Sequence, residues 1–354
     1  DVGPRQPQRR RWRGTVTAEE YDNYFCSYGE LLHQKDMLED KARMDAYFSA
    51  IRGNAANFEG KVVLDLGCGT GVLALFAAQA GARKVYAVEA TSVAKHAEAM
   101  AVSNGLSGVV TVIEGTIEEV GLPEQVDIIV SEWMGHFLLR ESMIDSLLYA
   151  RDKFLKSDGA MYPSSARMYL APASYTDDEV ESKGPDFEQQ VEDWNEFVAE
   201  WMDAHGLDLS SLTHTYTEEA RKAYLGGSQG VEIEVSDLLG PPVCVKEIDL
   251  LTATLEECSH VRHDDEALAM KLFAPCNGAE GESGPGGSGG RSPLTMFVGW
   301  FTVAFEGSPS SPSLVEVELS TGPEEPLGTH WGQEAFIVYP PLPLRADEDS
   351  IQCR

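Results

Sequence analysis

Two glutamates, nine positions apart, are the residues of this chain whose type and spacing point most directly to chemistry. Glu132 and Glu141 lie in the segment 131–143, SEWMGHFLLRESM, called here the double-glutamate loop. A guanidinium is a planar fork of N–H donors, which two carboxylates can grip at opposite edges. Such a grip fixes one terminal nitrogen and biases the positive charge away from it, so its lone pair can attack an electrophile.

Paired carboxylates also serve as general acid and base on a sugar, or as metal ligands. The sequence places no cluster of histidines or further carboxylates beside Glu132 and Glu141 to support either role. Both alternatives are therefore disfavoured, and so is a purely structural role. No metal is expected.

A glycine-rich segment, DLGCGTG at 65–71, supplies the second candidate site. Glycines here allow a sharp turn and let a ligand approach the backbone closely. A dinucleotide fold would place its third glycine at position 72, where this chain has Val72. The pattern favours a nucleoside without a pyrophosphate, such as S-adenosylmethionine, held near Asp65, Gly67 and Gly69.

Two acidic residues extend this candidate site. Glu89 stands 22 positions after Gly67, at the end of the next apolar run, where a carboxylate can accept both ribose hydroxyls. Glu118 follows the third apolar run, where it could meet an adenine amino group. Acidic loop residues are common in this chain, so Glu118 taken alone would be unremarkable.

The elements that must position these residues alternate along the first half of the chain. Helix-like segments at 71–80 and 91–104 separate the first three of four short apolar runs, which lie at 62–68, 85–90, 109–115 and 126–132. Such alternation predicts a doubly wound α/β domain with a parallel sheet. Ligands bind at the carboxyl ends of such strands, where both motifs lie.

After Pro163 the pattern changes. A strand-like alternation at 164–172 is followed by a helical pattern at 186–204, and further β-type runs lie at 243–251, 295–305, 314–319 and 335–339. These runs predict a second, mostly antiparallel domain of barrel or sandwich type. The segment 278–290, with seven glycines, is expected to be a flexible loop.

The end of the chain carries a separate expectation. Pro340, Pro341 and Pro343 follow the last apolar run, and the segment 346–354 is polar. Because proline cannot donate to a ladder, no central strand is expected here. A barrel would then lack its closing strands, which predicts a truncated C-terminus.

Charge and composition limit the partners. The net charge is −31, but residues 1–13 hold five arginines against one aspartate, so the remaining chain carries −35. Such a body repels nucleic acid and attracts cationic partners. No apolar run is long enough to span a membrane. The six scattered cysteines have neither zinc nor redox spacing, which is typical of a cytoplasmic or nuclear protein.

Several motifs together resemble the protein arginine methyltransferase family. They are the double-glutamate loop, a Y-F-x-x-Y signature at 24–28, Met37 with Leu38, Arg43, and a T-H-W loop at 329–331. The segment 33–48 is most similar to the plant-type branch numbered ten. The resemblance implies a Rossmann-like methyltransferase domain, an antiparallel β-barrel domain and a helical dimerisation arm.

The resemblance also implies what the chain does and with what. It implies a type I enzyme that transfers methyl groups from S-adenosylmethionine to protein arginines and makes monomethyl- and asymmetric dimethylarginine. Acceptors would be histone tails or arginine–glycine segments. The implied parts are cofactor-covering helices at 21–45, the cofactor domain at 46–163 and the barrel domain at 164–354, whose arm at about 175–230 forms a head-to-tail homodimer. The charge pattern of the basic tail at 1–20 favours disorder over a localisation signal or a self-methylation target.

The family's functional residues carry over to matching positions of this sequence. Arg43 would pair with the cofactor carboxylate, and His330 would pair with Asp40 near the active site. Met37 and Met134 would crowd the acceptor nitrogen and shape the product. Further cofactor or pocket contacts are implied for Gln34, Met143, Tyr24, Phe25 and Tyr28.

Some features depart from the family or leave choices open. His136 stands where the family usually has tyrosine, and Gln34 stands where histidine is frequent. Trp194, Phe197 and Trp201 share one helix face, which serves either a dimer contact or an internal core. A methyltransferase for another acceptor and a non-enzymatic dimeric adaptor are the rival functions.

Overall fold

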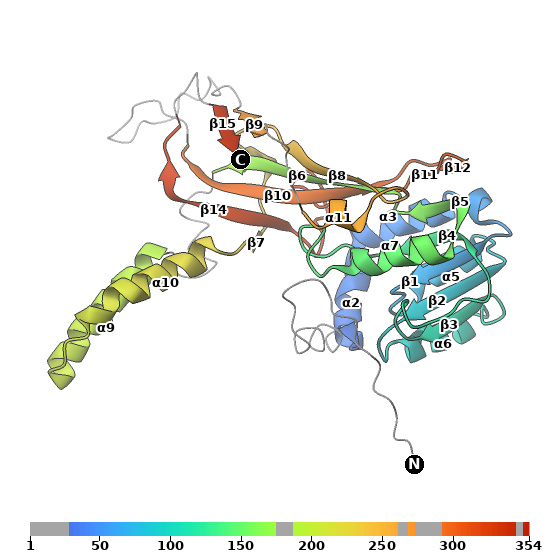
Figure 1. The fold of residues 1–354 in the computed structure, drawn as a ribbon, viewed down its shortest axis with the longest axis horizontal. Coiled ribbons are helices and arrows are strands. Elements are labelled where there is room, and N and C mark those ends of the chain that lie inside the picture. The colour runs from blue at the N-terminus through green and yellow to red at the C-terminus, as the bar shows by residue number, and fades with distance from the viewer. Residues whose placement is uncertain (1–27, 175–186, 261–267, 273–291, 345–349, 354) are drawn as a thin grey trace, which may run out of the picture.

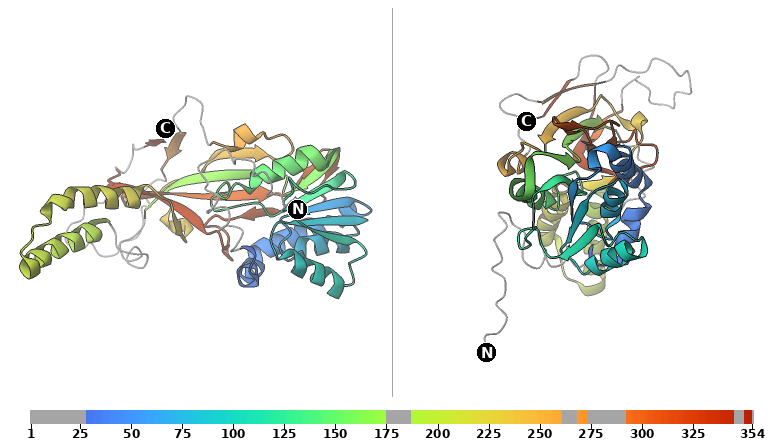
Figure 2. Two further views of the ribbon diagram at one scale, coloured as in Figure 1. Left: turned by 60° about the horizontal axis from the view of Figure 1, so that its bottom comes forward. Right: turned by 90° about the vertical axis from the view of Figure 1, so that its right-hand side faces the viewer.

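The computed structural model describes residues 28–174, 187–260, 268–272, 292–344 and 350–353. The tail at 1–20, Tyr24, Phe25 and the glycine-rich segment 278–290 lie outside the described residues. Figures 1 and 2 show three parts: a sheet flanked by helices, a long antiparallel sheet beside it, and a pair of helices that projects from the far end.

The N-terminal sheet contains the predicted parallel strands. Its order is β12-β11-β5-β4-β1-β2-β3, and β5-β4-β1-β2-β3 are parallel. The four predicted runs are confirmed, while β5 and the short antiparallel edge strands were not foreseen. The strands are β1 Val62–Leu66, β2 Lys84–Glu89, β3 Val110–Glu114, β4 Val126–Ser131, β5 Leu155–Tyr162, β11 Gly307–Ser308 and β12 Ser311–Pro312.

Helices flank this sheet and carry residues of the candidate site. Both predicted helices form, as α5 and α6, and Gly105 follows α6 with a φ of 70°, as expected for a C-terminal stop. The helices are α2 Leu31–Glu39, α3 Lys41–Arg52, α4 Ala55–Phe58, α5 Val72–Gln79, α6 Ala94–Ser103 and α7 Met143–Phe154.

The second half forms a mostly antiparallel sheet, as predicted for the barrel-type domain. Its order is β7-β14-β10-β6-β8, with β13 on β10, and β9 pairs separately with β15. The strands are β6 Ser165–Ala173, β7 Gln229–Val231, β8 Val243–Asp249, β9 Leu268–Lys271, β10 Leu294–Ala304, β13 Glu318–Ser320, β14 Gln333–Leu342 and β15 Ser350–Cys353; the short helices η2 Val235–Asp237 and α11 Leu255–Cys258 lie between strands.

The predicted strand at 314–319 is mostly wrong. Only β13 pairs there, and Leu314 is 70% exposed. The buried Asn54 explains the difference, because its Oδ1 accepts hydrogen bonds from the backbone amides of Leu314 and Val315 at 2.6 and 2.8 Å. These amides bind a side chain of the N-terminal domain in place of a neighbouring strand.

The strand predicted at 335–339 extends further than expected. β14 continues through Pro340 and Pro341, and β15 forms antiparallel to β9 in the polar segment near the end of the chain. A register shift opposite Leu294 accommodates the prolines. β7 pairs only with the first residues of β14, so in the described structure the prolines lie where β14 has a neighbour on one side only, a setting that tolerates proline.

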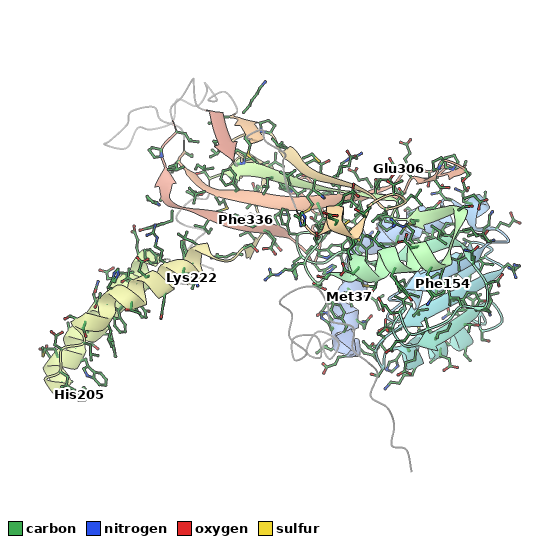
Figure 3. The ribbon with its side chains drawn as sticks, in the orientation of Figure 1. Met37, Phe154, His205, Lys222, Glu306 and Phe336 are labelled. Atoms are coloured by element: carbon green, nitrogen blue, oxygen red, sulfur yellow. The ribbon has the colours of Figure 1, made fainter. Side chains whose placement is uncertain are left out.

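The projecting helices are α9 Phe187–His205 and α10 Thr213–Leu225, joined through the 3-10 turn η1 Ser210–Leu212 and called here the arm. The predicted helix at 186–204 is confirmed. His205 marks the far end of the arm, and Lys222 of α10 lies near the base of the arm (Figure 3). Trp194 stacks on Tyr216 of α10 at 4.2 Å, whereas Phe197 is 42% exposed, so the aromatic stripe is partly internal and partly uncovered.

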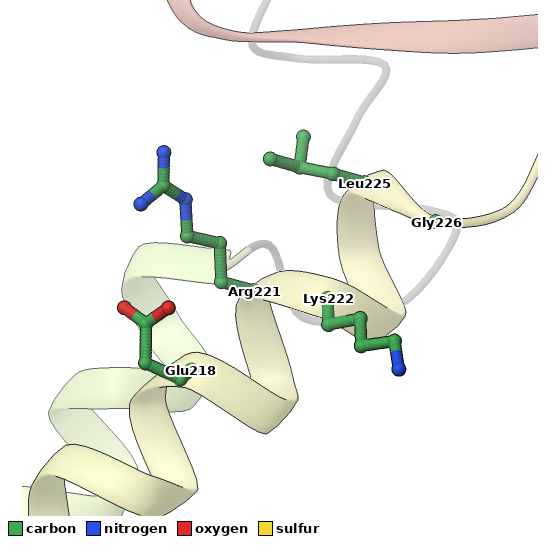
Figure 4. Close-up of a pocket in the computed structure, with 5 residues that line it drawn as sticks. All are labelled: Glu218, Arg221, Lys222, Leu225 and Gly226. Atoms are coloured by element: carbon green, nitrogen blue, oxygen red, sulfur yellow. The ribbon is translucent and has the colours of Figure 1, made fainter.

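A shallow hollow lies on α10 of the arm (Figure 4). It is lined by Glu218, Arg221, Lys222, Leu225 and Gly226, and it contains none of the predicted site residues. Each helix in the described part of the chain is too short or too polar to cross a bilayer.

Candidate active site

The glycine loop, residues 67–71, joins β1 to α5 at the carboxyl edge of the parallel sheet. Gly67, Gly69 and Gly71 have φ angles of 68°, 52° and 83°, which L side chains rarely adopt. A Cβ at Gly67 would collide with the Met143 side chain, and one at Gly69 would lie 2.7 Å from Oε1 of Gln34. The loop therefore lies directly against two residues that the resemblance implied as cofactor contacts.

Glu89 ends β2 beside this loop and is buried. Its Oε2 accepts a hydrogen bond from the Gly69 amide at 2.9 Å, and its Oε1 accepts one from the Thr91 amide at 2.8 Å. The carboxylate predicted for the ribose thus also fixes the glycine loop. Carboxylate oxygens have further lone pairs, so these bonds leave acceptor capacity for hydroxyl donors.

Asp65 lies at the end of β1, 1% exposed, and among the described residues its carboxylate makes no hydrogen bond of good geometry; the Ala74 backbone amide lies close enough only to oppose part of the pKa shift. Burial raises the pKa of Asp65 to about 7, and the negative charge of Glu89 adds to the shift. An ionisable group with such a pKa changes charge in the physiological range.

Glu132 is bound by Arg43 from α3. Nη2 of Arg43 lies 2.9 Å and Nε 3.3 Å from Oε2 of Glu132, and Nη1 donates to the Met37 carbonyl at 2.8 Å. Both side chains are nearly buried. The resemblance implied that Arg43 pairs with the cofactor; in the structure its partner is Glu132.

Glu141 is bound by Tyr28, which precedes α2. The Tyr28 hydroxyl donates to its Oε2 at 2.8 Å, and Nε2 of Gln34 donates to the Tyr28 carbonyl at 2.9 Å. Tyr28 was expected to cover the cofactor, and the structure places its hydroxyl on the second glutamate. Both glutamates of the loop are thus held by residues of the segment 28–43.

The double-glutamate loop has an unusual backbone. Phe137, Leu138, Glu141 and Ser142 all have φ between 46° and 82°, although none is glycine. Such conformations are costly and persist where the surrounding structure enforces them, often at functional sites. No sequence pattern signalled this strain.

Buried hydrogen bonds enforce the loop's path at its start. The Tyr47 hydroxyl donates to the Ser131 carbonyl at 2.9 Å, and the Met134 amide donates to Oε1 of Glu132 at 3.1 Å. Trp331 of the C-terminal half donates from Nε1 to the Met134 carbonyl at 3.1 Å. Sequence reasoning missed Tyr47; a fully buried tyrosine that needs a partner for its hydroxyl was the available signal.

His330 reaches Asp40 across the two domains. Its Nδ1 lies 2.6 Å and its backbone nitrogen 3.0 Å from Oδ2 of Asp40, whose Oδ1 caps α3 by accepting from the Arg43 amide at 2.9 Å. Burial works to raise the pKa of Asp40, but the hydrogen bonds from His330 and Arg43 outweigh it and lower the pKa. The implied pair is therefore present.

The remaining site residues are less closely joined. Met37 and Met134 are both buried, on α2 and in the double-glutamate loop, and Figure 3 shows Met37 on the helix next to the parallel domain. Glu118 lies exposed after β3, where its Oε1 accepts from the Ser146 hydroxyl at 2.8 Å. Its adenine role stays a prediction. Among the described residues, histidine, cysteine and carboxylate side chains form no metal-binding cluster.

Comparisons with known proteins match both halves of the chain. A methyltransferase-domain family profile matches residues 63–159, and an arginine methyltransferase oligomerization subdomain profile matches residues 184–354. Protein arginine N-methyltransferase PRMT10 of Oryza sativa subsp. japonica is 46% identical over 330 residues, which cover 93% of this chain and 82% of that protein. Protein arginine N-methyltransferase 6 of Danio rerio is 37% identical over 91% of this chain and 80% of its own.

Solved structures of protein arginine methyltransferases also match the chain. The Arabidopsis thaliana protein arginine methyltransferase 10 crystal structure, described as uniquely open, has a TM-score of 0.81 at 44% identity and covers 91% of this chain and 87% of its own. The Trypanosoma brucei PRMT1 enzyme–prozyme heterotetramer with AdoHcy has a TM-score of 0.70 at 30% identity, covering 91% and 86%.

The first testable prediction concerns Asp65. Because its folded-state pKa is raised, its contribution to stability is full below pH 4 and is lost as pH rises through about 7. Between pH 5 and pH 8 the wild type should lose about 2–3 kcal/mol of unfolding free energy relative to Asp65→Asn. Urea denaturation of the ligand-free proteins measures this difference. An equal difference between the two proteins at both pH values would contradict the assignment.

Proposed function

The chain belongs to the protein arginine N-methyltransferase family, and from this premise we propose that it is a type I enzyme, making monomethyl- and asymmetric dimethylarginine. It transfers methyl groups from S-adenosylmethionine to guanidinium nitrogens of protein arginines. The observation that carries the proposal is the contact between the double-glutamate loop and the N-terminal segment 28–43. There Arg43 binds Glu132 and the Tyr28 hydroxyl binds Glu141.

The residues at the carboxyl edge of the parallel sheet fit the cofactor. The left-handed glycine loop leaves no room for side chains at Gly67 and Gly69, and Glu89 presents a buried carboxylate beside it. We assign Asp65, Gly67, Gly69, Glu89, Gln34 and Met143 to hold the cofactor, with Glu118 on the adenine side. When bound, S-adenosylmethionine supplies an electrophilic methyl group on a positively charged sulfur.

The ion pair of Glu132 supports the arginine grip directly. Two nitrogens of the Arg43 guanidinium already lie on Oε2 of Glu132, so this carboxylate can bind a guanidinium in its observed position. The family resemblance implies that Arg43 would hold the cofactor carboxylate, and in that case Glu132 would be free to bind the acceptor guanidinium. Glu141 takes the other edge, and the two charges orient one nitrogen for attack.

Two methionines support the assignment of the product. Met37 and Met134 are buried on either side of Arg43 and Glu132: the Met37 carbonyl accepts from Arg43, and the Met134 amide donates to Glu132. We assign their side chains to limit the space around the acceptor nitrogen. Asp40 and His330 act as positioning residues, which tie the T-H-W loop to the N-terminus of α3.

The acceptors and the location follow from charge and cysteine chemistry. We assign basic acceptors, histone tails or arginine–glycine segments, because the chain carries a net charge of −31. Three cysteines of the described residues, Cys68, Cys244 and Cys258, are free. They support a cytoplasmic or nuclear location, since thiols stay reduced there.

The product prediction tests the type I assignment. Labelled S-adenosylmethionine is incubated with histone-tail and arginine–glycine peptides, and the modified arginines are resolved by mass spectrometry. We expect monomethyl- followed by asymmetric dimethylarginine. Symmetric dimethylarginine, or monomethylarginine alone after prolonged reaction, would overturn the assignment.

The catalytic prediction uses Glu141→Gln, which keeps the shape and removes one charge. We expect kcat to fall at least a hundredfold, because the guanidinium loses a charged partner in the transition state, with the affinity for S-adenosylhomocysteine nearly unchanged. Glu124→Gln is the matched control, since Glu124 pairs with Arg83 at the surface. Near-normal turnover of Glu141→Gln would refute the grip.

The matched oligomerization subdomain includes the arm, and we propose a head-to-tail homodimer built through it. Within the described residues of the arm only Phe187 is buried, whereas Phe197, Met202, Leu207 and Leu212 are exposed. Such apolar exposure on a projecting element needs a partner surface.

The arm prediction follows from this exposure. Replacing 187–226 with a short Gly-Ser linker should convert a dimer into a monomer in sedimentation and reduce turnover. Glu192→Gln, a charge change on α9 away from the apolar positions, is the control. A deletion variant that remains dimeric would show that another surface makes the dimer.

A further inference from the structure

A buried carboxylate outside the predicted site faces the double-glutamate loop. Glu334 on β14 is 4% exposed, and among the described residues its Oε2 has no hydrogen-bond partner. Its Oε1 lies 3.8 Å from Nδ1 of His136, which is too long for a hydrogen bond. The sequence offered no signal for Glu334, which directly precedes the run predicted as a strand at 335–339.

The strand's alternation shows which way Glu334 faces. Glu334 and Phe336 lie on the same face of β14, because side chains two positions apart do so. Figure 3 shows Phe336 on this strand, and its ring lies 5.5 Å from that of Phe137, the neighbour of His136 in the double-glutamate loop. The same Phe137 ring covers Gly299, the residue that β10 places opposite Glu334.

Glu334 is therefore a buried acceptor with unused capacity beside the loop that carries Glu132 and Glu141. A buried carboxylate without a hydrogen bond is costly, and a positively charged donor that reached it would remove that cost. The His136 side chain next to it is 49% exposed, so it links the buried carboxylate to the protein surface. The 3.8 Å contact between the two side chains becomes an ion pair only if His136 is protonated.

We propose that Glu334, entered past His136, is a second acidic subsite that binds a lysine or arginine side chain flanking the target arginine. This inference rests on the proposed function and adds a residue that determines acceptor choice. Glu132 and Glu141 select the arginine that is methylated, and Glu334 selects its neighbour in the acceptor chain. Glu334 touches the acceptor but not the reacting atoms.

The competing explanation is a structural contact, in which a protonated His136 and Glu334 fasten the loop to the antiparallel sheet. The two explanations differ in what the acceptor sequence does. A structural contact affects all acceptors alike, whereas a subsite acts only on acceptors that carry a positive charge at the matching position.

The test uses the full chain and pairs of peptides, each with one target arginine and either lysine or norleucine at one flanking position. With the wild type, lysine at one position should lower KM about tenfold relative to norleucine, with little change in kcat. Glu334→Gln should abolish this ratio by raising the KM of the lysine peptide to that of the norleucine peptide. Glu318→Gln, which removes an exposed charge on β13, should keep the ratio.

Each other outcome has a defined meaning. No flanking preference in the wild type at any position overturns the subsite, whether or not Glu334→Gln folds. An equal loss for both peptides in Glu334→Gln shows a structural contact and also overturns it. His136→Gln should keep the preference for the lysine peptide. If His136→Gln loses this preference while Glu334→Gln retains it, Glu334 is not the subsite. Failure to methylate any peptide would refute the proposed function instead.

Discussion

The ion pair between Arg43 and Glu132 is the interaction on which the geometry of the site depends. Both partners are nearly buried, so each would be costly if the other were removed. The pair joins α3 to the end of β4, and Arg43 also binds the Met37 carbonyl. One guanidinium therefore sets the spacing between the N-terminal helices, the first glutamate and the buried methionine.

Asp40 and Trp331 extend this junction to the C-terminal domain. Asp40 caps α3 through the Arg43 amide and binds both the ring and the backbone nitrogen of His330. The next residue, Trp331, donates to the Met134 carbonyl inside the double-glutamate loop. Two hydrogen-bonded side chains thus fix the antiparallel domain against the loop, which places Glu334 beside it. The interface between domains is therefore part of the site.

The cofactor edge relies on a different constraint, which is the shape of the backbone. The positive φ angles of the glycine loop exclude side chains, and the Glu89 carboxylate holds the loop by the Gly69 amide. Asp65 in β1 has no hydrogen bond of good geometry among the described residues and a pKa of about 7. Backbone shape thus defines the proposed cofactor side, while paired side chains define the proposed acceptor side.

The sequence by itself determined the local elements and their chemistry. Strand and helix periodicity located β1 to β4, α5, α6 and α9, and glycine spacing marked the turn after β1, because these features depend on neighbouring residues. Periodicity could not predict which distant groups compete for the same hydrogen-bond donors. The Asn54 side chain accepts hydrogen bonds from backbone amides of the segment predicted as a strand at 314–319. β14 tolerates its prolines because it is paired on one side only at their positions. Likewise only the tertiary structure decided that Arg43 binds Glu132 and that Tyr28 binds Glu141, since these partners are far apart in the sequence. It also decided that Glu334 is buried with no hydrogen bond to Oε2 among the described residues.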